Sequence, residues 1–136
     1  DSIDGTLMVG IVIVTHVMLG DALLACARHI MQRDVPNLAH LAVSKADDPD
    51  EVLERARQVC AELDDGSGVL LLTDIYGGTP SNVAGRLITP GRIEAVAGVN
   101  LPMLLRVLTY RKNPMETLLQ KAISGGHDGI INLHRR

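Results

Sequence analysis

The chain has 136 residues, of which 46% are hydrophobic, and a formal net charge of -3 at pH 7. This length and composition fit one globular domain with a buried core and exclude a disordered chain. The acidic balance and the scarcity of aromatic residues (two Tyr, no Phe and no Trp) argue against a nucleic-acid surface, which needs basic groups and rings for stacking.

The sequence shows no segment typical of a membrane span or a secretory signal. The longest strongly apolar run, residues 7–14, is too short to cross a bilayer, and the polar start DSIDGTL has no basic region. We therefore expect a cytoplasmic protein without direct membrane insertion. Residues 1–8 are expected to be a short N-terminal arm or a cloning remnant, and residues 9–136 to form a single domain.

Apolar strands and amphipathic helices alternate along the chain. In chain order we expect a strand at 9–15, a helix at 18–32, a strand at 38–43, a helix from 49, a strand at 69–74, a helix from 79, a strand at 93–97, helices after 100 and after 113, and a short strand at 129–133. A capping residue followed by proline marks three of the helix starts. Gly125 and Gly126 are expected to end the last helix.

This alternation predicts an α/β fold, a mainly parallel sheet with helices on both faces. Right-handed crossovers narrow the topology to a doubly wound, flavodoxin-like sheet of order 2-1-3-4. The segment 129–133 is short and followed by polar residues, so it is expected to be an edge strand able to pair with another subunit. Cys26 and Cys60 have no CxxC spacing and are expected to be reduced thiols in the core.

Two side chains with acid–base chemistry end neighbouring strands of this sheet. Doubly wound sheets bind ligands at the carboxyl ends of strands where the winding direction switches, here between the first and third strands. The first of these strands ends at Thr15 and His16, and the third ends at Asp74. The sequence therefore predicts an imidazole and a carboxylate within reach of each other at one edge of the sheet.

The stretch IYGGTPSN after Asp74 predicts an anion site beside this pair. Gly77 and Gly78 permit a tight turn, and Thr79 is expected to cap a helix whose first N–H groups point back at the crevice. Together these groups suit phosphoryl transfer through histidine. Asp74 would hold the proton on one ring nitrogen and leave the other free to attack, while amides near Gly78 and Thr79 hold the phosphoryl oxygens.

Each of these signals also has a plain structural reading. A histidine at a strand end is usually a hydrogen-bonded structural residue, and a Gly-Gly turn is common. A receiver domain phosphorylated on a carboxylate needs an acidic pair after the first strand, where this chain has Thr15, His16 and Val17. We expect no metal site, because no histidine or cysteine pair has ligand spacing, and no cofactor, because GxGxxG and P-loop motifs are absent.

Three stretches resemble a known family. GIVIVTH at 10–16, GVLLLTDIYGGTPSNVAGRL at 68–87 and EAVAGVNLPMLLRVL at 94–108 are similar to the A component (EIIA) of the mannose family of the bacterial phosphoenolpyruvate-dependent sugar phosphotransferase system (PTS). The resemblance extends over nearly the whole chain, from residue 9 to about 133. Its most specific parts are the D-x-aromatic-G-G-[ST]-P motif that begins at Asp74 and the GVNLPML motif.

The resemblance implies a phosphocarrier with a phosphohistidine intermediate. His16 would take a phosphoryl group from the phosphorylated carrier protein HPr and pass it to a separate B component (EIIB) during sugar uptake. By position in the motif, Asp74 would orient His16, and Gly78 and Thr79 would bind the phosphoryl group. The family fold also implies a homodimer in which an antiparallel fifth strand, here 129–133, is exchanged between subunits.

One position departs from the family pattern, and two other functions stay open. Glycine usually follows the active histidine, whereas this chain has Val17. If this position has a left-handed backbone, valine costs about 1–2 kcal/mol. The first alternative function is a regulatory, phosphorylation-dependent protein-binding module with no role in transport. The second is a small hydrolase using the same crevice, although no second general acid is apparent.

Overall fold

Four parallel strands form one sheet in the order β2-β1-β3-β4, as the sequence predicts. The computed structural model describes residues 7–135. The strands are β1 (Gly10–His16), β2 (Leu38–Val43), β3 (Val69–Thr73) and β4 (Ile93–Ala97). The helices are α1 (Leu19–Met31), α2 (Pro49–Leu63), α3 (Thr79–Leu87), α4 (Leu101–Tyr110) and α5 (Met115–Asp128), followed by a short 3-10 helix, η1 (Leu133–Arg135).

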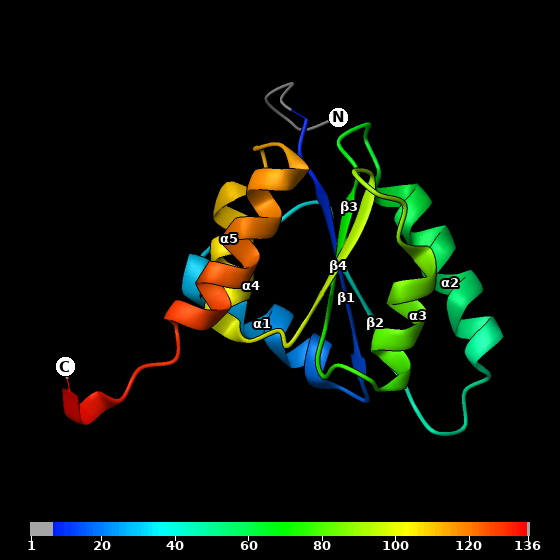
Figure 1. The fold of residues 1–136 in the computed structure, drawn as a ribbon, viewed down its shortest axis with the longest axis horizontal. Helices are drawn as coiled ribbons and strands as arrows, with labels where there is room; N and C mark the ends of the chain where they lie inside the picture. The colour runs from blue at the N-terminus through cyan, green and yellow to red at the C-terminus, as the bar shows by residue number, and fades with distance from the viewer. Residues whose placement is uncertain (1–6, 136) are drawn as a thin grey trace.

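The helices cover both faces of the sheet, with α2 and α3 on one face and α1, α4 and α5 on the other (Figure 1). Alternate residues of each central strand enter the two cores because side chains alternate along a strand. Ile11 and Ile13 pack with α1, α4 and α5, whereas Val12 and Val14 pack with α2 and α3. The doubly covered sheet explains why β1 and β3 are continuous apolar runs.

The register of the strands places the end of β1 beyond the end of β3. Val14 pairs with Thr73, the last residue of β3, and His16 lies two residues further along β1, opposite Val43 of β2. Asp74, the residue that follows Thr73, therefore lies at the start of a loop beside the end of β1. This offset brings the expected site residues to one edge of the sheet.

Two sequence predictions need correction at the level of packing. Helix α5 does not end at Gly125 and Gly126 but continues to Asp128. A Cβ at these two glycines would lie 2.8 Å from Cβ of Arg106 and 2.9 Å from Cε of Met103. The glycines therefore allow close packing of α5 against α4 rather than ending the helix. Cys60 is buried as expected, but Cys26 is exposed, because the buried side of α1 is formed by Gly20, Leu24 and Ala27.

The predicted fifth strand is also absent from the described chain. Residues 129–132 extend away from the body of the domain and lead into η1 (Figure 1). Ile130, Ile131 and Leu133 are all exposed. A strand needs a neighbouring strand, and this segment leaves α5 on the side away from the sheet, so it has none in its own chain. Its pairing with a second subunit stays a prediction.

The expected N-terminal arm, residues 1–8, lies largely outside the described residues. Met8 is buried, and its amide donates a hydrogen bond to Oδ2 of Asp65 at 2.9 Å. Within residues 7–135, no helix combines the length and the apolar character that spanning a membrane requires.

Candidate functional site

His16 and Asp74 meet at the carboxyl edge of the sheet. His16 is the last residue of β1, and Asp74 directly follows β3. Nδ1 of His16 lies 2.8 Å from Oδ2 of Asp74, and the same oxygen accepts a hydrogen bond from the backbone amide of His16 at 2.8 Å. Oδ1 of Asp74 accepts the amide of Ile75 at 2.9 Å. This geometry favours the tautomer with a proton on Nδ1 and leaves the lone pair of Nε2 unshared.

The environment of Asp74 keeps its carboxylate ionised. Burial alone would raise the pKa of Asp74, but hydrogen bonds from the amide and ring of His16 and from the amide of Ile75 outweigh burial and lower it. The Asp74 side chain is 10% exposed, whereas the His16 ring is 47% exposed. The site therefore pairs a protected negative charge with an accessible imidazole, an arrangement that stabilises a ring becoming positively charged.

The glycine turn after β3 lies directly against the imidazole. A Cβ at Gly78 would lie 2.8 Å from Cε1 and 3.3 Å from Nε2 of His16, so only glycine allows this approach. Gly77 has a φ of +92°, which is the left-handed region that glycine adopts at no cost. The turn brings the backbone of the α3 start to the edge of the ring that carries Nε2.

Thr79 does not cap α3 as expected. The N-cap residue is Gly78, which has an extended backbone (φ -80°, ψ 171°), and among the described residues no side chain provides a cap hydrogen bond. The turn is one residue shorter than expected, so Thr79 already has helical backbone and is the first residue of α3. Thr79 lines the pocket beside His16.

An open pocket of about 350 Å³ lies in front of the imidazole. We call it the imidazole pocket; its lining residues come from the end of β1, the end of β2, the glycine turn and α3. They are His16, Val43, Ser44, Lys45, Gly77, Gly78, Thr79 and Asn82. The sequence analysis did not identify Ser44, Lys45 and Asn82. Two signals could have found them: Ser44 and Lys45 follow the strand beside β1, and Asn82 lies one helical turn after Thr79.

Val17 has the left-handed backbone that the sequence analysis considered. Its φ is +50°, and its amide donates a hydrogen bond to the carbonyl of Val43 at 2.9 Å. The chain turns sharply at this residue between β1 and α1. A β-branched side chain in this region of backbone space is strained, so Val17 stores energy directly beside His16.

Exposed apolar side chains surround the site. They come from the turn after β1, the first residue of α1 and the turn after β3. The residues are Val17, Met18, Leu19, Ile75 and Tyr76. Exposed apolar groups gathered around a polar centre are typical of a protein–protein contact surface.

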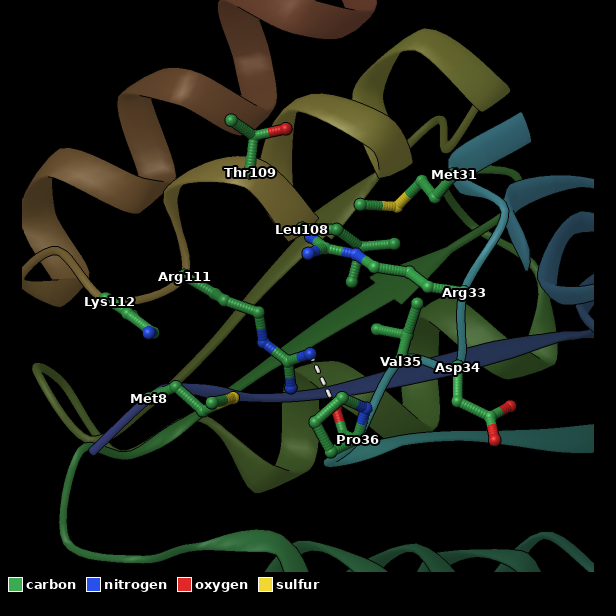
Figure 2. A pocket seen from close by; sticks show the side chains of 10 residues that line it. All are labelled: Met8, Met31, Arg33, Asp34, Val35, Pro36, Leu108, Thr109, Arg111 and Lys112. Atoms are coloured by element: carbon green, nitrogen blue, oxygen red, sulfur yellow. Dashed lines mark hydrogen bonds between the residues drawn. The ribbon is translucent and has the colours of Figure 1, made fainter. Parts of the chain in front are cut away.

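A second pocket, of about 340 Å³, lies at the opposite edge of the sheet (Figure 2). The guanidinium of Arg111, a buried side chain, donates hydrogen bonds to the carbonyls of Pro36 at 2.6 Å, Asn37 at 2.6 Å and Val9 at 3.2 and 3.3 Å. Burial lowers the pKa of Arg111 to about 10, so the group is still charged at neutral pH. Its donors are used to hold backbone segments together, which makes Arg111 a structural residue.

Within residues 7–135, no group of three His, Cys, Asp or Glu side chains gathers as a metal site would require. The arrangement around His16 instead offers an imidazole nucleophile, a carboxylate partner and a polar pocket.

Comparisons with known proteins point to one system. A family model described as "PTS system fructose IIA component" (EIIA-man) matches residues 10–123. The mannose-specific EIIAB component of Escherichia coli K12 is 30% identical over 125 residues, which cover 90% of this chain and 38% of that protein. The fructose-specific EIIA component of Bacillus subtilis is 37% identical over 78 residues, which cover 57% of this chain and 53% of that protein. The chain thus spans about 38% of the length of the EIIAB relatives.

Solved structures share the fold. A PTS component EIIA from Streptococcus agalactiae superimposes with a TM-score of 0.84 at 26% identity, over 95% of this chain and 100% of that one. A mannose/sorbose-specific IIA subunit from Enterococcus faecalis superimposes with a TM-score of 0.82 at 21% identity, over 93% and 95% of the two chains. Both comparisons match the doubly wound sheet described above.

Proposed function

The chain belongs to the fructose IIA (EIIA-man) family of the sugar phosphotransferase system, and from this premise we propose that it is a phosphocarrier phosphorylated on His16. In this role it accepts the phosphoryl group from phosphorylated HPr and passes it to the B component of the same system. The observation that carries the proposal is the 2.8 Å contact between Nδ1 of His16 and Oδ2 of Asp74, which leaves Nε2 as the nucleophile.

The transfer is an in-line exchange between two imidazoles. The lone pair of Nε2 of His16 attacks the phosphorus, a new N–P bond forms, and the N–P bond of the donor histidine breaks with its electron pair leaving on the donor ring. Positive charge grows on the His16 ring during this step. The ionised carboxylate of Asp74 stabilises that charge through Nδ1–H and keeps the ring in one orientation.

The start of α3 is proposed to bind the phosphoryl oxygens. The first N–H groups of a helix have no partner inside the helix, and the helix dipole places partial positive charge there. Gly78 and Thr79 lie at this end and line the imidazole pocket. The Thr79 hydroxyl and the first free amides of α3 would then hold the transferred group.

The apolar side chains around His16 are proposed to receive the two protein partners in turn. Direct transfer between histidines requires the donor protein to cover the site, because its phosphorus must come within bonding distance of Nε2. Met18 and Tyr76 are exposed by 69% and 86% and lie in the two turns that flank the site. A cytoplasmic location is part of the same proposal, because a soluble carrier protein must reach the exposed His16 site.

A homodimer with exchanged C-terminal segments is part of the proposal. β4 pairs with β3 on one side, and no other described strand pairs with its other side. Beside β4 lies a largely apolar groove of about 420 Å³ that includes Thr73, whose buried hydroxyl has no hydrogen-bond partner among the described residues. Segment 129–133 of a second copy, with its exposed Ile130 and Ile131, would add an antiparallel strand there.

Light scattering coupled to size exclusion tests the dimer. The wild-type protein should have twice the mass of one chain, and the double variant Ile130→Glu, Ile131→Glu should be a monomer that keeps its helical signal. A monomeric wild type, or a variant that stays dimeric, would exclude this mode of assembly.

Intact mass spectrometry tests the phosphocarrier function. The purified protein is incubated with phosphoenolpyruvate, enzyme I and HPr, and one added phosphoryl group, labile in acid and stable in base, is expected. His16→Gln should gain none. No added mass on the wild type, with HPr itself phosphorylated, would contradict the proposal. Labelling of His16 without onward transfer to a B component would instead favour the regulatory module.

A further inference from the structure

A basic residue is among those that line the imidazole pocket. Three lining residues, Val43, Ser44 and Lys45, come from the end of β2. Of the eight lining residues, which all belong to the described part of the chain, Lys45 is the one lysine or arginine, and no carboxylate is among them. A basic side chain in this pocket is a feature that neither the motif nor the helix start accounts for.

The backbone holds the Lys45 segment beside His16. His16 pairs with Val43 across β1 and β2, and the amide of Val17 donates to the carbonyl of Val43 at 2.9 Å. The turn that follows is fixed because the amide of Ser44 donates to Oδ2 of Asp47 at 2.8 Å. Lys45 therefore lies in a hydrogen-bonded turn that follows the strand residue opposite His16.

The ammonium of Lys45 is not neutralised by a neighbouring acid. Asp47, the nearest acid in sequence, accepts from the amide of Ser44 and lies 4.0 Å from Nη2 of Arg55. Within residues 7–135, no carboxylate lies within 4 Å of the Lys45 ammonium. Arg86, the cation on α3, pairs with Asp50 at 3.4 Å and lines the groove beside β4 instead.

A phosphoryl group on Nε2 of His16 would add negative charge to the pocket, and the ammonium of Lys45 would offset part of it. The group adds close to two negative charges to a ring that already contacts the carboxylate of Asp74. The α3 start offers about half a positive charge on one side of the pocket. A full cation on the opposite side would complete the neutralisation, and an ammonium is a good partner for phosphoryl oxygens.

We propose that Lys45 binds the phosphoryl group carried by His16 and stabilises the phosphohistidine. The inference rests on the proposed function of His16. It involves no covalent step, since Nζ–H of Lys45 donates hydrogen bonds to the phosphoryl oxygens. It makes Lys45 a second binding residue for the transferred group, across the pocket from Thr79.

The test compares three variants with the wild type. Lys45→Gln removes the charge, Lys45→Arg keeps it, and Lys121→Gln removes the same charge from α5, where the ammonium lies 4.4 Å from the centre of the Tyr110 ring. Each protein is phosphorylated with phosphoramidate, a small donor that needs no docking surface. Because Lys45 is exposed, its variants should fold normally.

Two readouts report on the charge beside the phosphoryl group. The second pKa of the phosphohistidine, followed by ³¹P NMR, should be higher in Lys45→Gln than in the wild type, because the dianion loses its cation. The phosphorylation rate of Lys45→Gln should fall about threefold to tenfold at low salt, with a smaller difference at high salt. Lys45→Arg and Lys121→Gln should match the wild type in both readouts.

The outcomes separate this inference from the proposed function. A wild type labelled on His16, with a Lys45→Gln variant unchanged in both pKa and rate, would overturn the role of Lys45 and leave the phosphocarrier intact. An equal loss in Lys121→Gln would overturn it as well, because the effect would then be one of net charge. A wild type that takes up no phosphoryl group from phosphoramidate or HPr would overturn both.

Discussion

A single oxygen, Oδ2 of Asp74, contacts both the ring and the backbone of His16. Its distance is 2.8 Å to Nδ1 of the imidazole and 2.8 Å to the amide nitrogen of the same residue. One carboxylate therefore fixes the end of β1 and the orientation of the nucleophile together. A change at Asp74 should therefore alter both the stability of the fold and the phosphorylation rate of His16. Measuring unfolding at two pH values and the rate separately distinguishes the two effects.

Asp74→Asn should slow phosphorylation of His16 about 10- to 100-fold, because an amide neither stabilises a positive ring nor selects the Nδ1–H tautomer. Hydrogen bonds lower the pKa of Asp74 below its usual 3.8 despite burial. Its stabilising contribution is therefore present above pH 3.8 and is lost as the pH falls through the lower, folded-state value. Urea unfolding at pH 7 and pH 3 should show a larger loss of stability in the wild type than in Asp74→Asn.

The exposed Asp34 provides the control for this change. Asp34→Asn should keep the wild-type rate and the wild-type loss of stability in acid. An Asp74→Asn protein with an unchanged rate would exclude the orienting role.

Gly78→Ala should displace the imidazole, because the new Cβ would lie 2.8 Å from Cε1 of His16. A misplaced nucleophile loses rate steeply, so phosphorylation should slow about 10- to 100-fold. Gly85→Ala is the matched control in α3, where an added Cβ meets nothing within 4 Å. It should keep the rate and gain about 0.5–1 kcal/mol of stability. Equal rates in both variants would show that the turn does not position the ring.

Val17→Gly should relieve the left-handed backbone at φ +50°. The relief of about 1–2 kcal/mol is opposed by about 0.5–1 kcal/mol of chain entropy, so the net gain in unfolding free energy should be up to about 1.5 kcal/mol. Gln32→Gly changes another left-handed residue, φ +56°, at the other end of α1 and should leave the phosphorylation rate unchanged. A faster rate in Val17→Gly alone would show that valine strains the active turn; a clear loss of stability would contradict the strain.

Arg111→Met should destabilise the protein by about 2–4 kcal/mol, because the carbonyls of Val9, Pro36 and Asn37 lose their guanidinium donor. The exposed Arg33 lines the same pocket (Figure 2), and Arg33→Met should change stability by less than about 0.5 kcal/mol. Urea unfolding measures both. Similar values for the two variants would mean that the buried hydrogen bonds of Arg111 contribute little.

Alkylation should distinguish the two cysteines. Cys26 is exposed and should react with iodoacetamide in the native protein, whereas buried Cys60 should react only in urea.

Burial, aided by the charge of Asp64, raises the pKa of Cys60 from 9.0 to about 11. The unfolded thiol therefore loses its proton first, and the fold should lose about 2 kcal/mol of stability as the pH rises from 9 to 11. Cys60→Ala should remove this loss of stability at high pH. In the alkylation experiment, modification of both cysteines in the native protein would contradict the burial of Cys60.

The sequence was informative wherever one physical effect dominates. The buried central strands β1 and β3 are continuous apolar runs, so both were predicted to within one residue of their observed bounds. The edge strands 38–43 and 93–97 were predicted with the observed bounds. The meeting of His16 and Asp74 followed from topology, since neighbouring parallel strands end at one edge.

The incorrect predictions concern residues whose role depends on tertiary contacts. Gly125 and Gly126 are typical of a helix end, yet they face α4 so closely that their function is to let two helices approach. Threonine is a common N-cap residue, but the turn is one residue shorter than expected and Gly78 is the N-cap of α3. Ser44 and Lys45 belong to no motif, and only the folding of the β2 turn toward His16 makes them part of the pocket.

The hydrogen bonds of Arg111 also have a consequence for the order of folding. They join residues that are 102, 75 and 74 positions apart in the chain. Closing loops of this length costs entropy before any contact repays it, so we expect the amino edge of the sheet to close late on the folding pathway. Interactions that form after the transition state act mainly on the unfolding rate. We therefore expect Arg111 to slow the unfolding of the domain and to have little effect on its folding rate.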